Sequence, residues 1–372
     1  MRRVTARPFV KLCSVLLSLS RSTRARRRSF ARASDILDAM VLRTRDEYLD
    51  AVDHALARNA AAVSARTERF RQKTLDWDIF ATSDVHCDFP KNAAELESYV
   101  ETRIRESARC RSDDVASAIV VAGDVGTAPE TVARTLRALA RCHDVVCYLP
   151  AGNHELWCGS SDKWAQEGTR PGDSIGKMLY LIDLCTSLGV CCSPIRLASV
   201  ALVPIYGWYD DDFCGDDSWR IGGHYSSLEK NFDCACAWPS FINPPERARN
   251  SHAPGIGAFM ADVNARAHER FASCTLAESD GNTVTVITYS HFLPRPELYR
   301  GRGNPALEKV MGSRKIDDDA RRWRARVHVF GHSHLNLDRE LDDVRYVQAA
   351  LGYPHERWFG SNHPKLIHPK LK

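Results

Sequence analysis

Short apolar runs of β type alternate along this chain with segments whose apolar residues recur at helical spacing. Helices are predicted over 91–109, 129–142 and 175–188. The alternation of strand, helix and strand predicts right-handed βαβ units and therefore an α/β fold. The runs that read as strands are 78–82, 118–122, 145–149, 200–206, 283–288, 327–330 and 345–349.

Two longer segments depart from this alternation. Residues 35–75 carry apolar side chains at helical spacing and contain neither Gly nor Pro, so we expect a helical arm over 35–76. Residues 207–282 are rich in Trp, Asp, Cys and Pro and show little periodicity. We expect a loop-rich insertion there, lying over the functional site. The remaining body, 77–372, is predicted to form the main domain.

The N-terminal segment 1–34 has a composition of its own. It holds nine Arg and one Lys, and the first acidic residue is Asp35. This composition is typical of an organelle transit peptide, either plastid or mitochondrial. The alternative is a disordered basic tail on a cytoplasmic protein.

Charge and cysteine content narrow the class of protein. The formal charge of the whole chain is +4, but without residues 1–34 the balance is 41 basic against 47 acidic side chains. A mildly acidic body counts against a general nucleic-acid binder, which would carry a basic face. The 13 Cys are scattered, as expected of free thiols in a reducing compartment. No apolar run reaches the roughly 18 residues of a membrane span.

Metal-binding side chains follow directly after the predicted strands. Asp124 comes after the run 118–122 and Gly123, and the other groups follow further runs in the same way. Residues two apart in an extended segment point the same way, so Asp84 and His86 can grip one ion. The candidate metal ligands are Asp84, His86, Asp124, Asn153, His291, His332 and His334, with His154 and Glu155 beside them.

This set is too large for one ion and suits two, a standard device for displacement at phosphorus. Two divalent ions, the two carboxylates of Asp84 and Asp124 and a bridging hydroxide leave a net charge of about +1, which attracts a phosphate. Mixed imidazole and carboxylate donors favour Mn, Zn or Fe over Mg or Ca. We therefore expect two divalent or trivalent metal ions.

The same residues resemble the motifs of the calcineurin-like metallophosphoesterase superfamily, in the order of that family. The flanking residues 290–294 and 347–354 resemble a poorly characterised branch found in plants, algae and microbes. The resemblance implies a four-layer α/β/β/α sandwich, here with the insertion and the helical arm. The motifs are Asp84-Val-His86, Gly123-Asp124, Gly152-Asn153-His154-Glu155, His291 and Gly331-His332-Ser333-His334.

The resemblance also implies roles. By this resemblance, Asp84, His86 and His334 would hold the first metal. Asn153, His291 and His332 would hold the second. Asp124 would bridge the two ions, and a bridging hydroxide would attack phosphorus in line. His154 would assist the leaving group, and Glu155 would orient His154.

The chain departs from the protein Ser/Thr phosphatases of this superfamily. Those enzymes carry phosphate-gripping arginines in two motifs, where this chain has Gly-Asp-Val-Gly-Thr and Ala-Gly-Asn-His-Glu. The substrate is therefore expected to be a small or medium phosphomonoester or phosphodiester. Arg295 and Arg357 are candidates to replace the missing arginines. The alternatives are a non-catalytic metal-binding scaffold and a nuclease on the same fold.

Overall fold

The structure is a computed structural model that describes most of the body of the chain. The predicted transit peptide, 1–34, lies outside the described residues. None of the described helices is long and apolar enough to cross a membrane. The described residues are 42, 44–71, 76–110, 115–159, 172–214, 229, 232–242, 254–277, 284–356 and 364–369.

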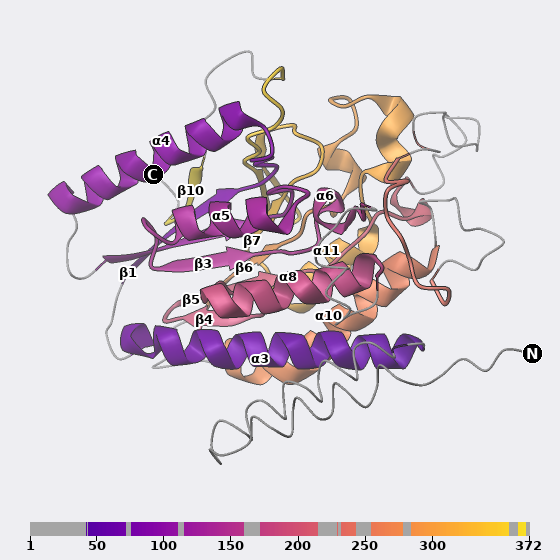
Figure 1. Ribbon diagram of the computed structural model, residues 1–372, viewed down its shortest axis with the longest axis horizontal. Helices are drawn as coiled ribbons and strands as arrows, with labels where there is room; N and C mark the ends of the chain where they lie inside the picture. Colours follow the sequence, from indigo (N-terminus) through magenta and orange to yellow (C-terminus); the bar gives the residue numbers. More distant parts are fainter. Residues whose placement is uncertain are drawn as a thin grey trace, which may run out of the picture.

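Two β-sheets pack face to face between layers of helices (Figure 1). The first sheet has four strands in the order β10-β1-β2-β3. Strands β1, β2 and β3 are parallel, and β10 runs antiparallel at one edge. Its members are β1 (Asp76–Thr82), β2 (Val115–Val121), β3 (Val145–Tyr148) and β10 (Lys365–His368).

The second sheet has six strands in the order β4-β5-β6-β7-β9-β8. Strands β5, β6, β7 and β9 are parallel, and antiparallel β4 and β8 form the edges. The strands are β4 (Ile195–Leu197), β5 (Val200–Pro204), β6 (Thr285–Tyr289), β7 (Val327–Phe330), β8 (Leu337–Leu341) and β9 (Val344–Gln348).

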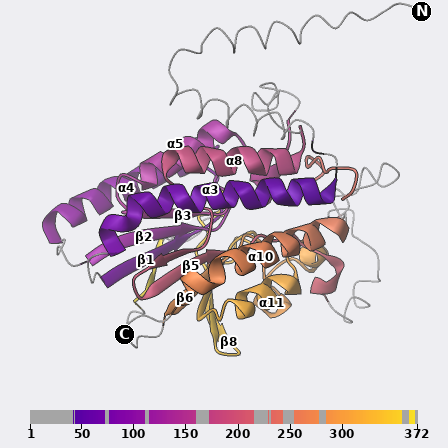
Figure 2. The ribbon, with the colours of Figure 1, turned by 90° about the horizontal axis from the view of Figure 1, so that it is seen from below.

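Helices cover the outer face of each sheet, which gives the expected α/β/β/α layers (Figure 2). The first sheet is covered by α4 (Pro90–Cys110), α5 (Pro129–Leu139) and α8 (Ser174–Leu188). The second is covered by α10 (Pro254–Thr275) and α11 (Arg314–Arg322). Strand β2 is buried along almost its whole length, as a continuous apolar run requires when both faces are covered.

Local sequence explains where these helices begin and end. Helix α5 starts with Pro129, whose missing N–H costs nothing in the first turn. Helix α8 is capped by Asp173, which accepts a hydrogen bond from the Gly176 N–H at 2.8 Å. It ends at Gly189, where φ is +75° and a side chain would be strained.

The N-terminal arm is the helix α3 (Arg45–Arg71), which packs on α8 and α10 (Figure 1). Its Asn59 is fully buried and donates to the Val190 carbonyl at 2.9 Å, while its oxygen accepts from Cys192 N–H at 2.8 Å. Because these bonds tie the arm to the chain after α8, the arm is part of the folded body.

The insertion differs in part from its predicted loop-rich character. Residues 254–275 form α10, a long helix that packs against α3 and α11. Trp208 and Tyr209, at the start of the insertion, are 1% and 3% exposed and pack on Phe292. These two side chains therefore form part of the core.

Candidate metal centre

The parallel strands of both sheets deliver the candidate ligands at their carboxyl ends. The segments after β1, β2 and β3 carry Asp84 with His86, Asp124 and Asn153. The segment after β6 carries His291, and the segment after β7 carries His332 and His334. Ligands normally bind at this end of parallel strands. The structure therefore brings all seven predicted ligands together at one end of the two sheets.

The backbone is strained at several of the candidate ligands. Across the described residues, ten other than Gly have a positive φ. Left-handed conformations cost energy in L-residues and cluster at functional sites. Five of the ten are candidate ligands: Asp84, His86, Asp124, His332 and His334.

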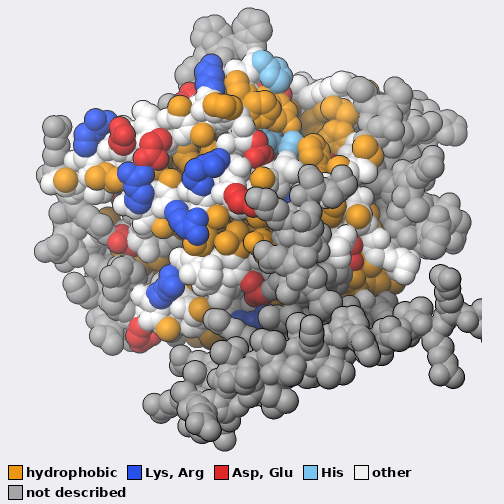
Figure 3. Space-filling view, viewed as in Figure 1, with side chains coloured by type: hydrophobic (Ala, Val, Ile, Leu, Met, Phe, Trp, Pro, Cys, Tyr) orange, Lys and Arg blue, Asp and Glu red, His pale blue; other side chains and the backbone are white. Residues whose placement is uncertain are grey.

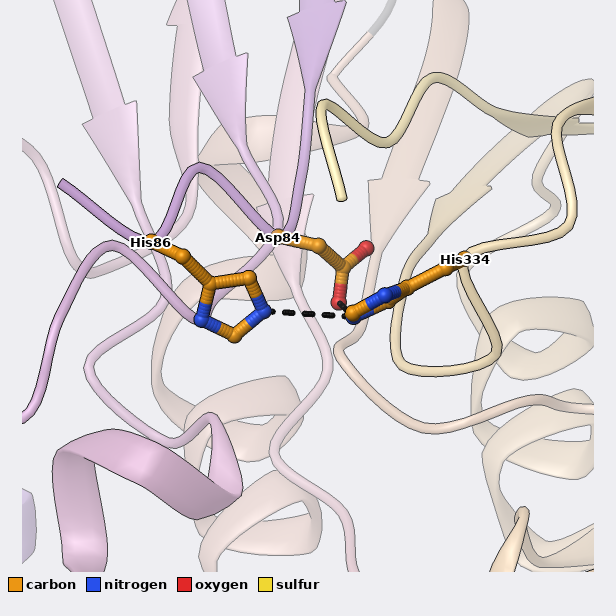
Figure 4. A group of neighbouring side chains, drawn as sticks. All are labelled: Asp84, His86 and His334. Atoms are coloured by element: carbon orange, nitrogen blue, oxygen red, sulfur yellow. Dashed lines mark hydrogen bonds and ion pairs between the residues drawn. The ribbon is translucent and has the colours of Figure 1, made fainter. Parts of the chain in front are cut away.

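Asp84, His86 and His334 form the first set of ligands (Figure 4). Their ligand atoms lie within 4.8 Å of one another. His86 Nε2 is 3.2 Å from His334 Nε2, which is 3.4 Å from an Asp84 oxygen. The Nδ1 of His334 donates to Glu356 at 2.6 Å, so its Nε2 is directed to the cluster.

Asn153, His291 and His332 form the second set. The Asn153 Oδ1 lies 2.9 Å from His291 Nε2 and 3.2 Å from His332 Nδ1. The opposite ring nitrogens are already engaged, because His291 Nδ1 donates to the Ala122 carbonyl and His332 Nε2 to that of Val310, both at 3.0 Å. In neutral rings the three converging atoms are therefore all acceptors.

Burial keeps these rings neutral. It lowers the pKa of His291 to about 4 and that of His332 well below its usual value, and neighbouring histidines act in the same direction. Three acceptors packed this closely repel each other unless a cation lies between them. The second set therefore fits a metal ion.

Asp124 lies between the two sets and faces both. Its Oδ2 is 3.5 Å from His291 Nε2 of the second set and 3.9 Å from His86 Nε2 of the first. Burial and the nearby carboxylates of Glu155 and Asp84 raise the pKa of Asp124 well above its usual value. Positive charge beside Asp124 would favour its ionised form, and a ligand that bridges two metal ions has such charge on both sides.

Close packing around the ligands leaves no room for larger residues at two glycines. Gly123 has φ +82°, and a Cβ there would lie 2.8 Å from His291 Nδ1. A Cβ on Gly331 would lie 2.8 Å from an Asp84 oxygen. The glycines that interrupt the strand runs therefore permit the ligands to approach one another.

His154 lies at the partly exposed rim of the cluster. Its Nε2 is 3.9 Å from Asp124 Oδ2 and 3.1 Å from the Tyr353 hydroxyl, and its ring packs against Trp157 in a tilted arrangement with centroids 3.8 Å apart. Burial, with His291 and His334, lowers the pKa of His154 to about 3. The ring is therefore neutral and can offer a hydrogen bond to a bound group.

Glu155 is placed differently from the expectation that it orients His154. Its two carboxylate oxygens accept from the N–H groups of Asp124 at 2.9 Å and Val125 at 2.6 Å. Among the described contacts none joins Glu155 to the His154 ring. The carboxylate instead holds the loop that carries Asp124, because Gly152 lets this loop approach closely.

Several residues near the cluster had no assigned role. Tyr353 stacks on His86 with centroids 4.5 Å apart, and Glu356 holds His334. Both follow β9, and the only sequence signal was the Gly-Tyr-Pro segment after a strand.

Arg295 pairs with Glu297 at 3.0 Å and Asp342 at 2.5 Å, so it is not directed to phosphate. Arg357 lies outside the described residues.

Comparison with known proteins yields one clear relative. No protein-family model matches the chain. The chain is 27% identical over 289 residues to the [acyl-carrier-protein] phosphodiesterase PptH of Mycobacterium tuberculosis, covering 75% of this chain and 78% of the relative. The crystal structure of phosphopantetheinyl hydrolase (PptH) from the same organism superposes with a TM-score of 0.57 at 20% identity, covering 80% of this chain and 97% of that chain.

The solved structure establishes the common fold, and the sequence relationship extends through most of both chains. Together they agree with the motifs and with their convergence on one edge of the two sheets. The relative, the shared fold and the motifs together support a calcineurin-like metallophosphoesterase, a hydrolase that acts on phosphoric ester bonds.

Proposed function

We propose that this chain is a dimetal phosphodiesterase that cleaves a phosphodiester carried by a protein. The observation that carries the dimetal part is the trio of acceptor atoms of Asn153, His291 and His332, 2.9–3.2 Å apart. These three residues would hold one ion. Asp84, His86 and His334 would hold the other. Asp124 would contact both.

Metal ions bound here supply Lewis-acid polarisation of phosphoryl oxygens and lower the pKa of water so that it can act as the nucleophile. The side chains of the cluster orient the phosphodiester and exclude most of the surrounding water, since five of the seven ligands are at most 3% exposed. The products are a phosphomonoester and an alcohol, with water providing the hydroxyl and the proton.

His154 is proposed to assist the leaving oxygen. It projects from the start of α6 (Asn153–Leu156), directly after the ligand Asn153, and lies close to Asp124. Trp157 on one side and the Tyr353 hydroxyl on the other hold its ring. A positioned N–H can donate to the oxygen on which negative charge develops.

The substrate class comes from the relative, which is named as a phosphodiesterase of acyl carrier protein and as a phosphopantetheinyl hydrolase. The rim of the site is suited to a group presented by a protein, because Tyr353 and His154 are partly exposed and Phe89 is 41% exposed. We therefore propose a phosphopantetheinyl carrier protein as the substrate.

A nuclease is the less favoured alternative. Basic and acidic side chains are interspersed on the face seen in Figure 3, with no continuous basic stripe among the residues described there. Nucleic acid binding depends on neutralising many phosphates with clustered Lys and Arg. The described surface in this view lacks that arrangement.

The test uses full-length protein loaded with Mn, Zn or Fe. Its substrates are a phosphopantetheinylated carrier protein, bis-p-nitrophenyl phosphate and p-nitrophenyl phosphate. We expect mass spectrometry to detect release of the phosphopantetheinyl group, and the diester to be hydrolysed faster than the monoester. Hydrolysis of the synthetic diester without release from the carrier would reject the substrate. Faster hydrolysis of the monoester would reject the diesterase assignment.

A further inference from the structure

The inserted segment between β5 and β6 reaches the metal centre through one buried acid, Asp233. This side chain is 5% exposed. Its Oδ1 accepts hydrogen bonds from Asn153 Nδ2 at 2.8 Å and from the Trp157 indole at 2.7 Å. One oxygen thus contacts a predicted metal ligand and the aromatic ring against which His154 packs.

We propose that Asp233 is a positioning residue of the metal centre, which fixes the Asn153 amide for metal binding and the Trp157 ring for support of His154. The proposal rests on the dimetal function proposed above. It assigns to the insertion a role in the chemistry.

The two ends of an Asn amide have nearly the same shape but opposite hydrogen-bonding character. Only the orientation with Oδ1 facing His291 and His332 can bind a metal ion. Because Asp233 accepts from Nδ2, the reversed amide would place two oxygens against each other and an NH2 group in the ligand set. Asp233 therefore selects the orientation that can bind metal.

The segment that carries Asp233 is fixed to the body of the fold. Cys236 forms an antiparallel bridge with Trp157, and Cys158 N–H donates to the Ala235 carbonyl at 2.9 Å. Glu229, fully buried, accepts from Lys309 N–H at 3.1 Å, next to the Val310 carbonyl that holds His332.

The neighbouring Phe232 touches the second set as well. Its ring meets the His332 ring edge to face, with centroids 5.7 Å apart. The dipeptide Phe232–Asp233 therefore contacts two of the three ligands of the second set. None of these contacts reaches the three ligands of the first set within the described part of the chain.

The backbone and charge of Asp233 support a functional role. Its φ is +53°, so it joins the five strained ligands of the cluster. A carboxylate buried this deeply carries a desolvation cost that an apolar residue would avoid. Its negative charge lies beside the set of ligands that otherwise supplies only neutral donors.

Trp157 is held at both ends. Its indole donates to Asp233, and its carbonyl accepts from the fully buried Lys177, whose Nζ also donates to the Thr127 carbonyl at 2.9 Å. With the ring thus fixed, His154 packs against it in a tilted arrangement at a centroid distance of 3.8 Å. Loss of the indole bond should loosen this support without disturbing Asn153.

The test compares metal binding of full-length wild type, Asp233→Ala and Asp210→Ala, in which the accepting oxygen is removed. Asp210 is the matched control, because it lies in the same insertion and accepts from Ser313 at 2.7 Å and Lys315 at 2.6 Å. Metal-free proteins are titrated with Mn²⁺ by equilibrium dialysis and elemental analysis. Thermal melts of the metal-free proteins measure folding.

Wild type and Asp210→Ala should bind about two ions per chain. Asp233→Ala should bind one ion as tightly and the other roughly 10- to 100-fold more weakly, as expected for loss of an outer contact to a ligand. Two unchanged affinities in Asp233→Ala would overturn the inference and leave the dimetal function standing. Wild type that binds no metal would overturn the dimetal function, and the positioning role with it.

Trp157→Phe provides a second arm that keeps the bond between Asp233 and Asn153. It should retain both metal affinities but slow hydrolysis more for diesters with poor leaving groups than for those with good ones. Equal slowing for all leaving groups would contradict the part of the inference that concerns His154. If Asp233→Ala does not fold, this arm still tests the support of His154 through the Trp157 ring.

Discussion

The first set of ligands, Asp84, His86 and His334, contains a carboxylate, whereas Asn153, His291 and His332 of the second set are neutral donors. The first set is supported by the exposed Glu356, which accepts from His334 at 2.6 Å. The second is enclosed by the buried acceptors Ala122, Val310 and Asp233, as its hydrogen bonds show.

The difference indicates two ways of holding an ion. Burial lowers the pKa of His334, but the charges of Asp84 and Glu356 outweigh it and raise the value to about 10. A proton and a metal ion would satisfy the same demand for positive charge in this set. In the second set the ligand atoms are neutral, so metal binding depends more on the correct orientation of each of them.

The largest effect is expected from Asp124→Asn, because the Asp124 Oδ2 lies within 3.9 Å of ligands of both sets, His291 and His86. Both metal affinities should fall by more than the roughly 10- to 100-fold that a lost outer contact costs. Asp84→Asn is the matched variant and should weaken the first ion much more than the second. Elemental analysis after dialysis checks this, and two ions tightly retained by Asp124→Asn would refute the bridging role.

His154→Ala should reduce turnover by about 10²- to 10⁴-fold while both ions remain bound. The loss should be greater for diesters with poor leaving groups. His54→Ala, which removes an exposed histidine of α3, provides the control and should leave turnover unchanged. A series of aryl phosphodiesters measures the dependence, and equal losses across the series would indicate charge stabilisation in place of leaving-group assistance.

A smaller and more local effect is expected from Glu356→Gln. Removing the charge that orients His334 should weaken the first ion by about 10-fold, at the low end for such contacts because Glu356 is exposed. The second ion should be unaffected. Metal titration beside Glu340→Gln, an exposed acid of β8, checks the specificity, and equal weakening of both ions would contradict the separation of the two sets.

The smallest effect concerns a buried histidine outside the metal centre. Burial, aided by Arg103, lowers the pKa of His143 from 6.5 to about 3, and its Nε2 lies 2.9 Å from the Tyr99 hydroxyl. Between these pH values the unfolded chain binds more protons, so stability rises with pH and is lost as pH falls from 6.5 towards 3.

His143→Gln removes this titration and keeps a partner for Tyr99. The free energy of unfolding should then depend less steeply on pH, by up to about 1.4 kcal/mol per pH unit within that window. Urea unfolding at about pH 7, 5 and 4 measures how the free energy of unfolding depends on pH. An unchanged slope would show that His143 takes up its proton in the folded chain.

Much of the frame that carries the site was predictable from the sequence. The parallel strands read as apolar runs because both of their faces are buried, and their ligands follow at once. The edge strands β4, β8 and β10 were missed. β4 has only three residues, β8 has exposed polar residues, and β10 has only two apolar residues, so none of them forms an apolar run.

Helix α10 was missed although Ile256, Phe259, Met260 and Val263 have helical spacing and are buried. The Trp-, Cys- and Pro-rich residues before it concealed the pattern. The positions of Asp233 and Glu356 could not be inferred at all. Their partners lie 80 and 22 residues away, and such approaches depend on how the folded chain packs.

The most direct test of the dimetal account is the metal content of the purified full-length chain, measured together with hydrolysis of bis-p-nitrophenyl phosphate. We predict about two ions per chain, with turnover that is lost on chelation and restored by Mn, Zn or Fe. A chain that binds no metal under any loading condition, or that hydrolyses the diester equally well without metal, would contradict the account.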